Sequence, residues 1–146
     1  MDPGSIFAPG FGGAITITDR RWRVHVRNIS TVVERAMRAA KCHADVVLTD
    51  DRTIKRLNAR DRARNKPTNV LTYEQPPEIL LGVGVVLREA RAEQKSVTAH
   101  LSHLLVHGAL HLAGYDHHQA GQARRMEREE TRLLARSRIK NPWKNR

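Results

Sequence analysis

Three histidines lie close together in residues 107–117, whose sequence is HGALHLAGYDH. His107 and His111 are four residues apart, so on a helix both side chains project from the same face. Gly114 accepts left-handed backbone dihedrals without a steric penalty, so the chain can turn there and bring His117 beside the first two. Three imidazole ligands leave the fourth position of a tetrahedral zinc ion open, as in catalytic zinc sites. The spacing therefore predicts one zinc ion, whose bound water would have a pKa of about 7.

Other histidines flank this group, and helix geometry limits which of them can share a metal ion. Because a helix rises 1.5 Å per residue, His103 and His111 would lie about 12 Å apart along its axis. We therefore expect His100 and His103 in the core or behind the ligands, and His118 in solvent. The segment is apolar on nearly every side, which predicts a buried helix whose imidazoles stay neutral and able to bind metal. Its apolar residues are Leu101, Leu104, Leu105, Val106, Ala109, Leu110, Leu112 and Ala113.

The chain of 146 residues carries 26 lysines and arginines against 15 aspartates and glutamates, a net charge of +11. A positive field of this size attracts polyanions and predicts binding to nucleic acid. Aromatic residues are few, so we expect contact with backbone phosphates rather than base stacking. The lysines and arginines form three groups along the chain. The third group is expected on a solvated helix face, where its arginines can form ion pairs with Glu127, Glu129 and Glu130. The groups are Arg20, Arg21, Arg23 and Arg27; Arg52, Lys55, Arg56, Arg60, Arg62, Arg64 and Lys66; and Arg124, Arg125, Arg128, Arg132, Arg136, Arg138, Lys140, Lys144 and Arg146.

Length and composition predict one domain with a modest core. Residues 1–13 are rich in glycine and proline and are expected to form a disordered lead, residues 14–140 the single domain that holds the metal site, and residues 141–146 a tail. Cys42 is the only cysteine, which excludes a disulfide framework and a cysteine zinc cage. The first residues lack the pattern of a secretory signal. We therefore expect a cytoplasmic protein with no membrane association.

The pattern of apolar residues predicts strands mixed with helices. Strands are expected at 14–18, 44–49, 70–73 and 80–87, and helices at 31–41, 51–60, 88–94, the histidine segment and 120–137. Residues 21–27 fit a strand or a helix. The expected helix caps are Thr31 with Glu34 as a capping box, Asp50 or Asp51, and Ser96 or Thr98. This order predicts an α+β fold, in which helices cover a small mixed β-sheet and a zincin-like three-histidine metal site lies on a buried helix.

Two segments of the chain resemble one protein family. HGALHLAGYDH at 107–117 resembles the H-G-x-L-H-L-x-G-Y-D-H signature of the YbeY proteins, which are bacterial single-domain, metal-dependent endoribonucleases. Asn58, Arg62 and KPTNVL at 66–71 resemble the second block of that family, a basic loop that ends in K-P-T-N-V-L-S-F. The similarity runs from about residue 44 to residue 135, and the two motifs in this order are highly specific.

The resemblance implies one zinc ion on His107, His111 and His117, and a functional arginine at Arg62 that binds phosphate. It implies cleavage of single-stranded ribosomal RNA, chiefly in maturation of the small-subunit RNA 3′ end, and a part in ribosome quality control. The expected partners are ribosomal RNA and the small subunit, with a ribosomal protein or a GTPase as a candidate protein partner. Other candidate RNA contacts are Arg56, Arg60, Arg64 and Lys66. Candidate hydrogen-bond partners of the ligating imidazoles are Tyr115 and Asp116.

The chain departs from the family pattern at two places. Gly82-Val83 stands where relatives usually carry Gly-Asp, so a role for that acid is not carried over to this chain. Thr72-Tyr73 stands in place of Ser-Phe, which is a milder change.

Two other functions compete with an endoribonuclease. Metzincin peptidases share the spacing H-x-x-x-H-x-x-G-x-x-H, but they place a glutamate base directly after the first histidine, where this chain has Gly108. A glycine cannot move a proton, which weighs against peptide hydrolysis. A non-catalytic ribosome-assembly factor would keep the metal for stability and the basic surface for RNA. RNA cleavage by the pure protein, with and without a chelator, distinguishes these functions.

Overall fold

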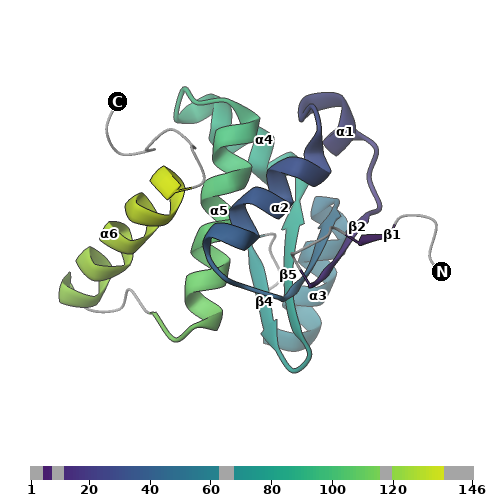
Figure 1. Ribbon diagram of the computed structural model, residues 1–146. Coiled ribbons are helices and arrows are strands. Elements are labelled where there is room, and N and C mark those ends of the chain that lie inside the picture. The colour runs from purple at the N-terminus through teal and green to yellow at the C-terminus, as the bar shows by residue number, and fades with distance from the viewer. Residues whose placement is uncertain (1–4, 8–11, 63–67, 116–119, 137–146) are drawn as a thin grey trace.

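The computed structural model describes residues 5–7, 12–62, 68–115 and 120–136, which form an α+β fold (Figure 1). Within these residues, one five-stranded sheet has the order β1-β2-β3-β5-β4. The strands are β1 (Ser5–Phe7), β2 (Ala14–Ile17), β3 (Asp45–Thr49), β4 (Leu71–Glu74) and β5 (Pro77–Gly82). The helices are α1 (Arg21–His25), α2 (Ile29–Ala39), α3 (Asp51–Arg62), α4 (Val83–Ala92), α5 (Val97–Leu112) and α6 (Ala120–Arg136). The predicted fold class, a small mixed sheet covered by helices, is confirmed.

The sheet is mixed because its central strand β3 runs parallel to both β2 and β5, while β1 and β4 run antiparallel to their neighbours. Parallel neighbours need crossover connections, and these contain α2 and α3. The two helices lie on opposite faces of the sheet (Figure 1). Side chains of β5 alternate accordingly: Ile79 and Leu81 belong to the main core with α2 and α5, while Leu80 packs with Ile54 and Leu57 of α3.

Helix α5 lies at the centre of the molecule, between the sheet and α6, and also packs against α2 and α4. Its N-terminus is capped by Ser96, whose Oγ accepts a hydrogen bond of 3.0 Å from the Ala99 amide. The burial expected for this helix is confirmed, since its apolar residues from Leu101 to Leu110 are all buried. Within the described residues, no helix is both long enough and apolar enough to cross a membrane.

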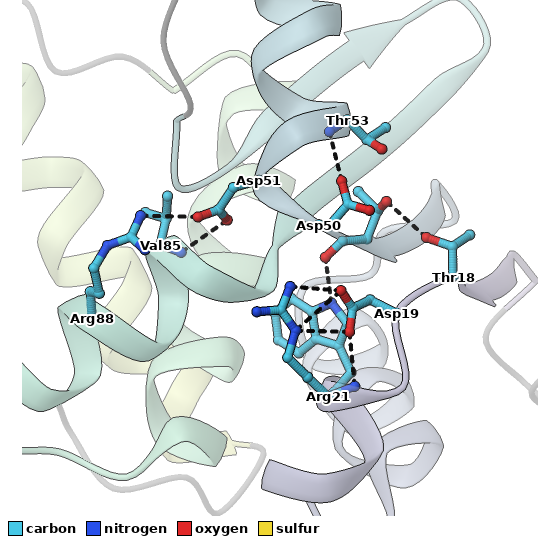
Figure 2. A network of polar contacts seen from close by, with 10 residues as sticks. Thr18, Asp19, Arg21, Asp50, Asp51, Thr53, Val85 and Arg88 are labelled. Carbon is cyan, nitrogen blue, oxygen red and sulfur yellow. Dashed lines mark hydrogen bonds and ion pairs between the residues drawn. The ribbon is translucent and has the colours of Figure 1, made fainter.

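The strand predicted at 80–87 is wrong beyond Gly82, where helix α4 begins. The run of valines there suggests a strand, yet Val83, Val86 and Ala90 are buried at helical spacing and face the core. Asp51 of α3 supports the start of this helix, because its Oδ1 accepts a hydrogen bond of 3.0 Å from the Val85 amide (Figure 2). The helix predicted at 88–94 is therefore the second half of α4.

The capping box predicted at Thr31 and Glu34 is also wrong. Helix α2 begins two residues earlier, after Asn28, whose left-handed backbone (φ 53°) starts the helix without a side-chain cap. This start lets Ile29 join the buried face of α2. The ambiguous residues 21–27 contain a short helix, α1, which is held in place by a hydrogen bond of 2.9 Å from Trp22 Nε1 to the carbonyl oxygen of Thr49.

Strand β1 lies inside the segment 1–13, for which the sequence predicts a disordered lead. Residues Ser5–Phe7 pair in antiparallel register with Ala14–Thr16 of β2. The expectation therefore does not hold for these three residues, because the free edge of β2 offers backbone hydrogen bonds that a strand can use.

Candidate metal centre on the histidine helix

The first two predicted metal ligands lie together near the C-terminal end of α5. The Nε2 atoms of His107 and His111 are 3.0 Å apart, and their rings meet edge to face with centroids 4.6 Å apart. Two nitrogens bound to one tetrahedral zinc, each about 2.0–2.1 Å from the ion, would lie roughly 3.3 Å apart. The two imidazoles therefore already present their nitrogens at close to the separation that a shared metal ion requires.

The chain turns directly after these ligands, as expected. Gly114 has φ 100°, in the left-handed region that only glycine adopts easily, and the Tyr115 amide donates to the carbonyl oxygen of Leu110. His117, His118 and Asp116 lie outside the described residues, as do Arg64 and Lys66. Among the described side chains, no three metal-binding residues surround a common point. His117 therefore stays a prediction as the third ligand.

A buried carboxylate, Glu130 of α6, holds His107 from behind. Its Oε1 lies 2.6 Å from His107 Nδ1 and its Oε2 lies 2.7 Å from His103 Nε2. Only 2% of Glu130 is exposed. Burial raises the pKa of this carboxyl, but the hydrogen bonds and charges of the two histidines outweigh burial and lower its pKa to about 2. Glu130 is therefore ionised at neutral pH.

An ionised carboxylate only accepts hydrogen bonds, which assigns the protons in this network. His107 must donate from Nδ1, so in the neutral form of the ring its Nε2 keeps a lone pair, which faces His111 Nε2. This is the tautomer in which a histidine binds metal, with its other nitrogen donating to a carboxylate. His103 must carry its proton on Nε2, and its Nδ1 lies 3.3 Å from Lys95 Nζ, which can donate to it. The described residues thus hold His107 ready to bind a metal ion.

Glu130 was missed in the sequence, where it reads as one of several acids on a solvated helix. A signal was present: Met126, Leu133 and Leu134 are buried at helical spacing from Glu130, so the acid lies on the apolar stripe of α6. A carboxylate in such a stripe needs a partner inside the protein. The expected burial of His100 and His103 is confirmed, with 3% and 7% exposed.

The other candidate residues lie at the end of α3 or beside the turn. Helix α3 ends at Arg62, whose side chain lies outside the described residues. Arg56 is exposed, and Arg60 forms an ion pair of 2.6 Å with Asp61. Tyr115 is 37% exposed after the turn. Glu130 is the described hydrogen-bond partner of His107 Nδ1, and Tyr115 stays a prediction as a partner of a ligating imidazole.

Gly108, which follows the first ligand, faces the sheet. A Cβ atom at this position would lie 3.2 Å from the Cγ2 atoms of both Val70 and Ile79. Glycine thus allows α5 to approach β5 closely, and a larger side chain at this position would crowd the side chains of Val70 and Ile79. Glycine carries no carboxylate, so the base of a metzincin peptidase is absent at this position.

Comparison with known proteins identifies one family. The family model described as endoribonuclease YbeY matches residues 13–138, which extends the similarity well before residue 44. A protein named endoribonuclease YbeY from Gluconobacter oxydans is 46% identical over 159 residues, with 99% of this chain and 93% of the relative covered. Another of that name, from Sinorhizobium medicae, is 45% identical over 117 residues, with 72% and 70% covered.

A solved structure supports the fold alone. The solution structure of a Thermotoga maritima protein covers 90% of this chain and 99% of its own, with a TM-score of 0.53 and 23% identity. The match over residues 13–138, together with the two close relatives, shows that this chain belongs to the YbeY family.

Proposed function

We propose that this chain is a metal-dependent endoribonuclease that cleaves single-stranded ribosomal RNA. Its proposed role is maturation of the small-subunit RNA 3′ end and ribosome quality control, in the cytoplasm. One observation carries the proposal: His107 and His111 direct their Nε2 atoms toward each other while Glu130 holds the Nδ1 proton of His107. Membership of a family named for endoribonuclease activity supports it.

His107, His111 and His117 are the residues that would hold the metal ion. Bound there, zinc would act as a Lewis acid toward a phosphoryl oxygen and lower the pKa of its water to about 7. Glu130 keeps the His107 lone pair available and fixes the orientation of its ring, since a rotated imidazole would lose the bond of 2.6 Å. Asp116 stays a proposed hydrogen-bond partner of the third histidine.

Arg62 is the residue proposed to bind the scissile phosphate. A guanidinium offers a planar set of donors that suits phosphate oxygens and stabilises the extra negative charge of the transition state. Arg56, Arg60, Arg64 and Lys66 are proposed contacts to the RNA backbone. Among the two that the structure describes, Arg56 is the better candidate, because Arg60 is already paired with Asp61.

The alternative functions are less well supported. Gly108 carries no carboxylate at the position of the metallopeptidase base, and a larger side chain there would crowd Val70 and Ile79. A non-catalytic assembly factor with a structural metal would bind the small subunit, alone or with a ribosomal protein or a GTPase, but would not cut RNA. It would also have little need of an open ligand position on the metal.

RNA cleavage by the pure chain tests the proposal. Wild type should cut a single-stranded ribosomal RNA fragment, and a chelator should stop it. His111→Ala should be inactive, while the matched variant His25→Ala, at an exposed position on α1, should cut normally. Equal cleavage in all samples would indicate a contaminating nuclease and overturn the proposal. Absence of cleavage with salt-sensitive ribosome binding would favour the assembly factor.

A further inference from the structure

A cavity of about 500 Å³ lies along the face of α5 that carries His107. It continues from His107 to His100, which is roughly 10 Å along the helix axis at 1.5 Å per residue. Helix α4 contributes Glu89, the residue that follows it contributes Glu93, and α6 contributes Met126. The volume is within the range of pockets that bind small organic groups. The cavity thus adjoins the candidate metal centre without containing both of its described ligands.

The charge of this cavity is opposite to that of the whole chain. Four glutamates line it, and none of the described lining residues is a lysine or an arginine, although the net charge of the chain is +11. The glutamates are Glu89, Glu93, Glu127 and Glu130. A phosphate group is therefore disfavoured here, and a neutral or cationic group with N–H donors is favoured.

His100 is the buried side chain whose hydrogen bonds indicate what kind of group the cavity could bind. Its Nε2 lies 2.8 Å from Glu89 Oε1 and therefore carries the proton that this carboxylate accepts. Burial is the largest influence on this imidazole and lowers its pKa, so the ring is neutral and its Nδ1 is an acceptor. Among the described residues, that Nδ1 is buried without a hydrogen-bond partner, at 3.6 Å from Glu93 Oε2, which is also an acceptor.

A buried acceptor needs a donor. Lys95 lies 3.3 Å from His103 Nδ1 and is not among the described residues that line the cavity. An amino group entering the cavity would satisfy His100 Nδ1. Glu89 would accept further N–H groups beside the one that Asn69 Nδ2 donates at 3.3 Å.

The apolar walls define the shape of the expected ligand. Leu104 and Met126 line the cavity with Ala92 and Ala123, and such side chains can pack against the faces of a flat ring. Proteins that recognise single-stranded RNA read unstacked bases through hydrogen bonds to their Watson–Crick edges. Guanine presents an N–H and an amino group side by side, which matches a carboxylate, whereas uracil has no amino group.

We propose that this cavity binds an amino-bearing base of the RNA, guanine best, beside the metal centre. The inference rests on the proposed function, because it makes the cavity the place where the enzyme reads a base of its substrate. It also gives a role to His100, Glu89 and Glu93, which the cleavage reaction itself does not use.

Titration of the full chain with nucleosides, followed by amide NMR shifts in the presence of a chelator, tests this inference. Guanosine should bind and shift amides around Glu89 and His100. Inosine lacks the 2-amino group and should bind several-fold more weakly, while uridine should not bind. Glu89→Gln should weaken guanosine binding by about 10-fold, the size expected for losing a charged acceptor. The control Glu34→Gln, on α2 and paired with Arg38, should bind guanosine normally.

The outcomes separate this inference from the proposed function. Equal binding of all three nucleosides, or shifts caused by Mg²⁺ but not by guanosine, would overturn the base pocket even if the chain cuts RNA. Guanosine binding by a chain that does not cut RNA would reject the nuclease and leave the pocket standing. The ligand comparison on wild type holds even where Glu89→Gln disturbs the fold.

Discussion

Two carboxylates, Glu130 and Asp51, each join elements that are distant in the sequence, but their partners differ in kind. Asp51 accepts a hydrogen bond from the Val85 amide and forms an ion pair of 3.0 Å with Arg88 (Figure 2). A backbone amide has no lone pair to bind a metal, and a guanidinium stays protonated. Glu130 instead accepts hydrogen bonds from two imidazoles, of which His107 directs its other nitrogen toward His111 Nε2. The first carboxylate therefore connects elements of the fold, and the second orients a residue of the proposed metal centre.

The surroundings of the two carboxylates fit this difference. A side chain at Gly82 would place its Cβ 2.7 Å from Asp51 Oδ1, so glycine lets α3 and the start of α4 approach each other. The Asp51 side chain is 25% exposed, whereas that of Glu130 is 2% exposed. Removing the partners of a buried ion strongly destabilises a protein, whereas removing the partner of a partly solvated ion has a small effect on stability. Substitutions at the two sites should therefore have different consequences.

The largest difference between the two sites is expected in RNA cleavage, when one partner of each carboxylate is removed. His107→Ala removes a proposed metal ligand and should lower RNA cleavage by at least about 100-fold, since even residues behind a ligand affect metal sites by 10–100-fold. Arg88→Ala removes the partner of Asp51 and should leave cleavage close to wild type. Initial rates on one RNA fragment measure both, and a similar loss in the two variants would contradict the division of roles.

The second-largest effect is expected at low pH, which should weaken the hydrogen bonds of Glu130 with His103 and His107. The pKa of Glu130 is about 2 in the folded chain, below its ordinary value of 4.5. As the pH falls, the unfolded chain therefore takes up a proton before the folded chain does, so stability is lost between pH 4.5 and about 2. The loss is on the order of 3 kcal/mol. Urea unfolding across this pH range should show a smaller loss for Glu130→Gln, and equal losses would be inconsistent with an ionised, doubly bonded Glu130.

Neutralising Glu130 should also weaken metal binding. Glu130→Gln should lower zinc affinity by about 10–100-fold, because an amide does not fix the proton of His107 on Nδ1 as a carboxylate does. Glu129→Gln is the matched control, since Glu129 lies on the same helix but pairs with Arg132 at the surface. Competition with a chromogenic chelator measures both. Equal affinity in the two variants would mean that Glu130 does not prepare the ligand.

Substitution of Asp51 should have the smallest effect of these changes. Asp51→Asn should destabilise the chain by about 1–2 kcal/mol, the size expected when one charged hydrogen-bonding group is weakened. Zinc affinity should not change, because the described hydrogen bonds of the Asp51 side chain go to Val85 and Arg88 of α4. Thermal unfolding and chelator competition together test this, and a fall in zinc affinity would link the two regions after all.

The pairing of His107 and His111 could be predicted because a spacing of four residues on a helix determines which side chains meet. Glu130 could not be found from spacing, since the contact joins α5 to α6 across 23 residues and depends on how the helices pack. Local composition gave the wrong prediction at Val83. The valine-rich run there suggests a strand, but these residues begin helix α4 and bury one face of it. Val83 is fully buried, so in this chain the position of the family's usual acid belongs to the apolar core.

Zinc content of the purified, untagged chain tests the central claim most directly. Atomic emission should find one zinc per wild-type chain and per His25→Ala chain, and far less in His111→Ala, provided that all three proteins are folded by circular dichroism. A full equivalent of zinc retained by His111→Ala, or none in wild type grown with added zinc, would contradict a metal centre on the histidine helix.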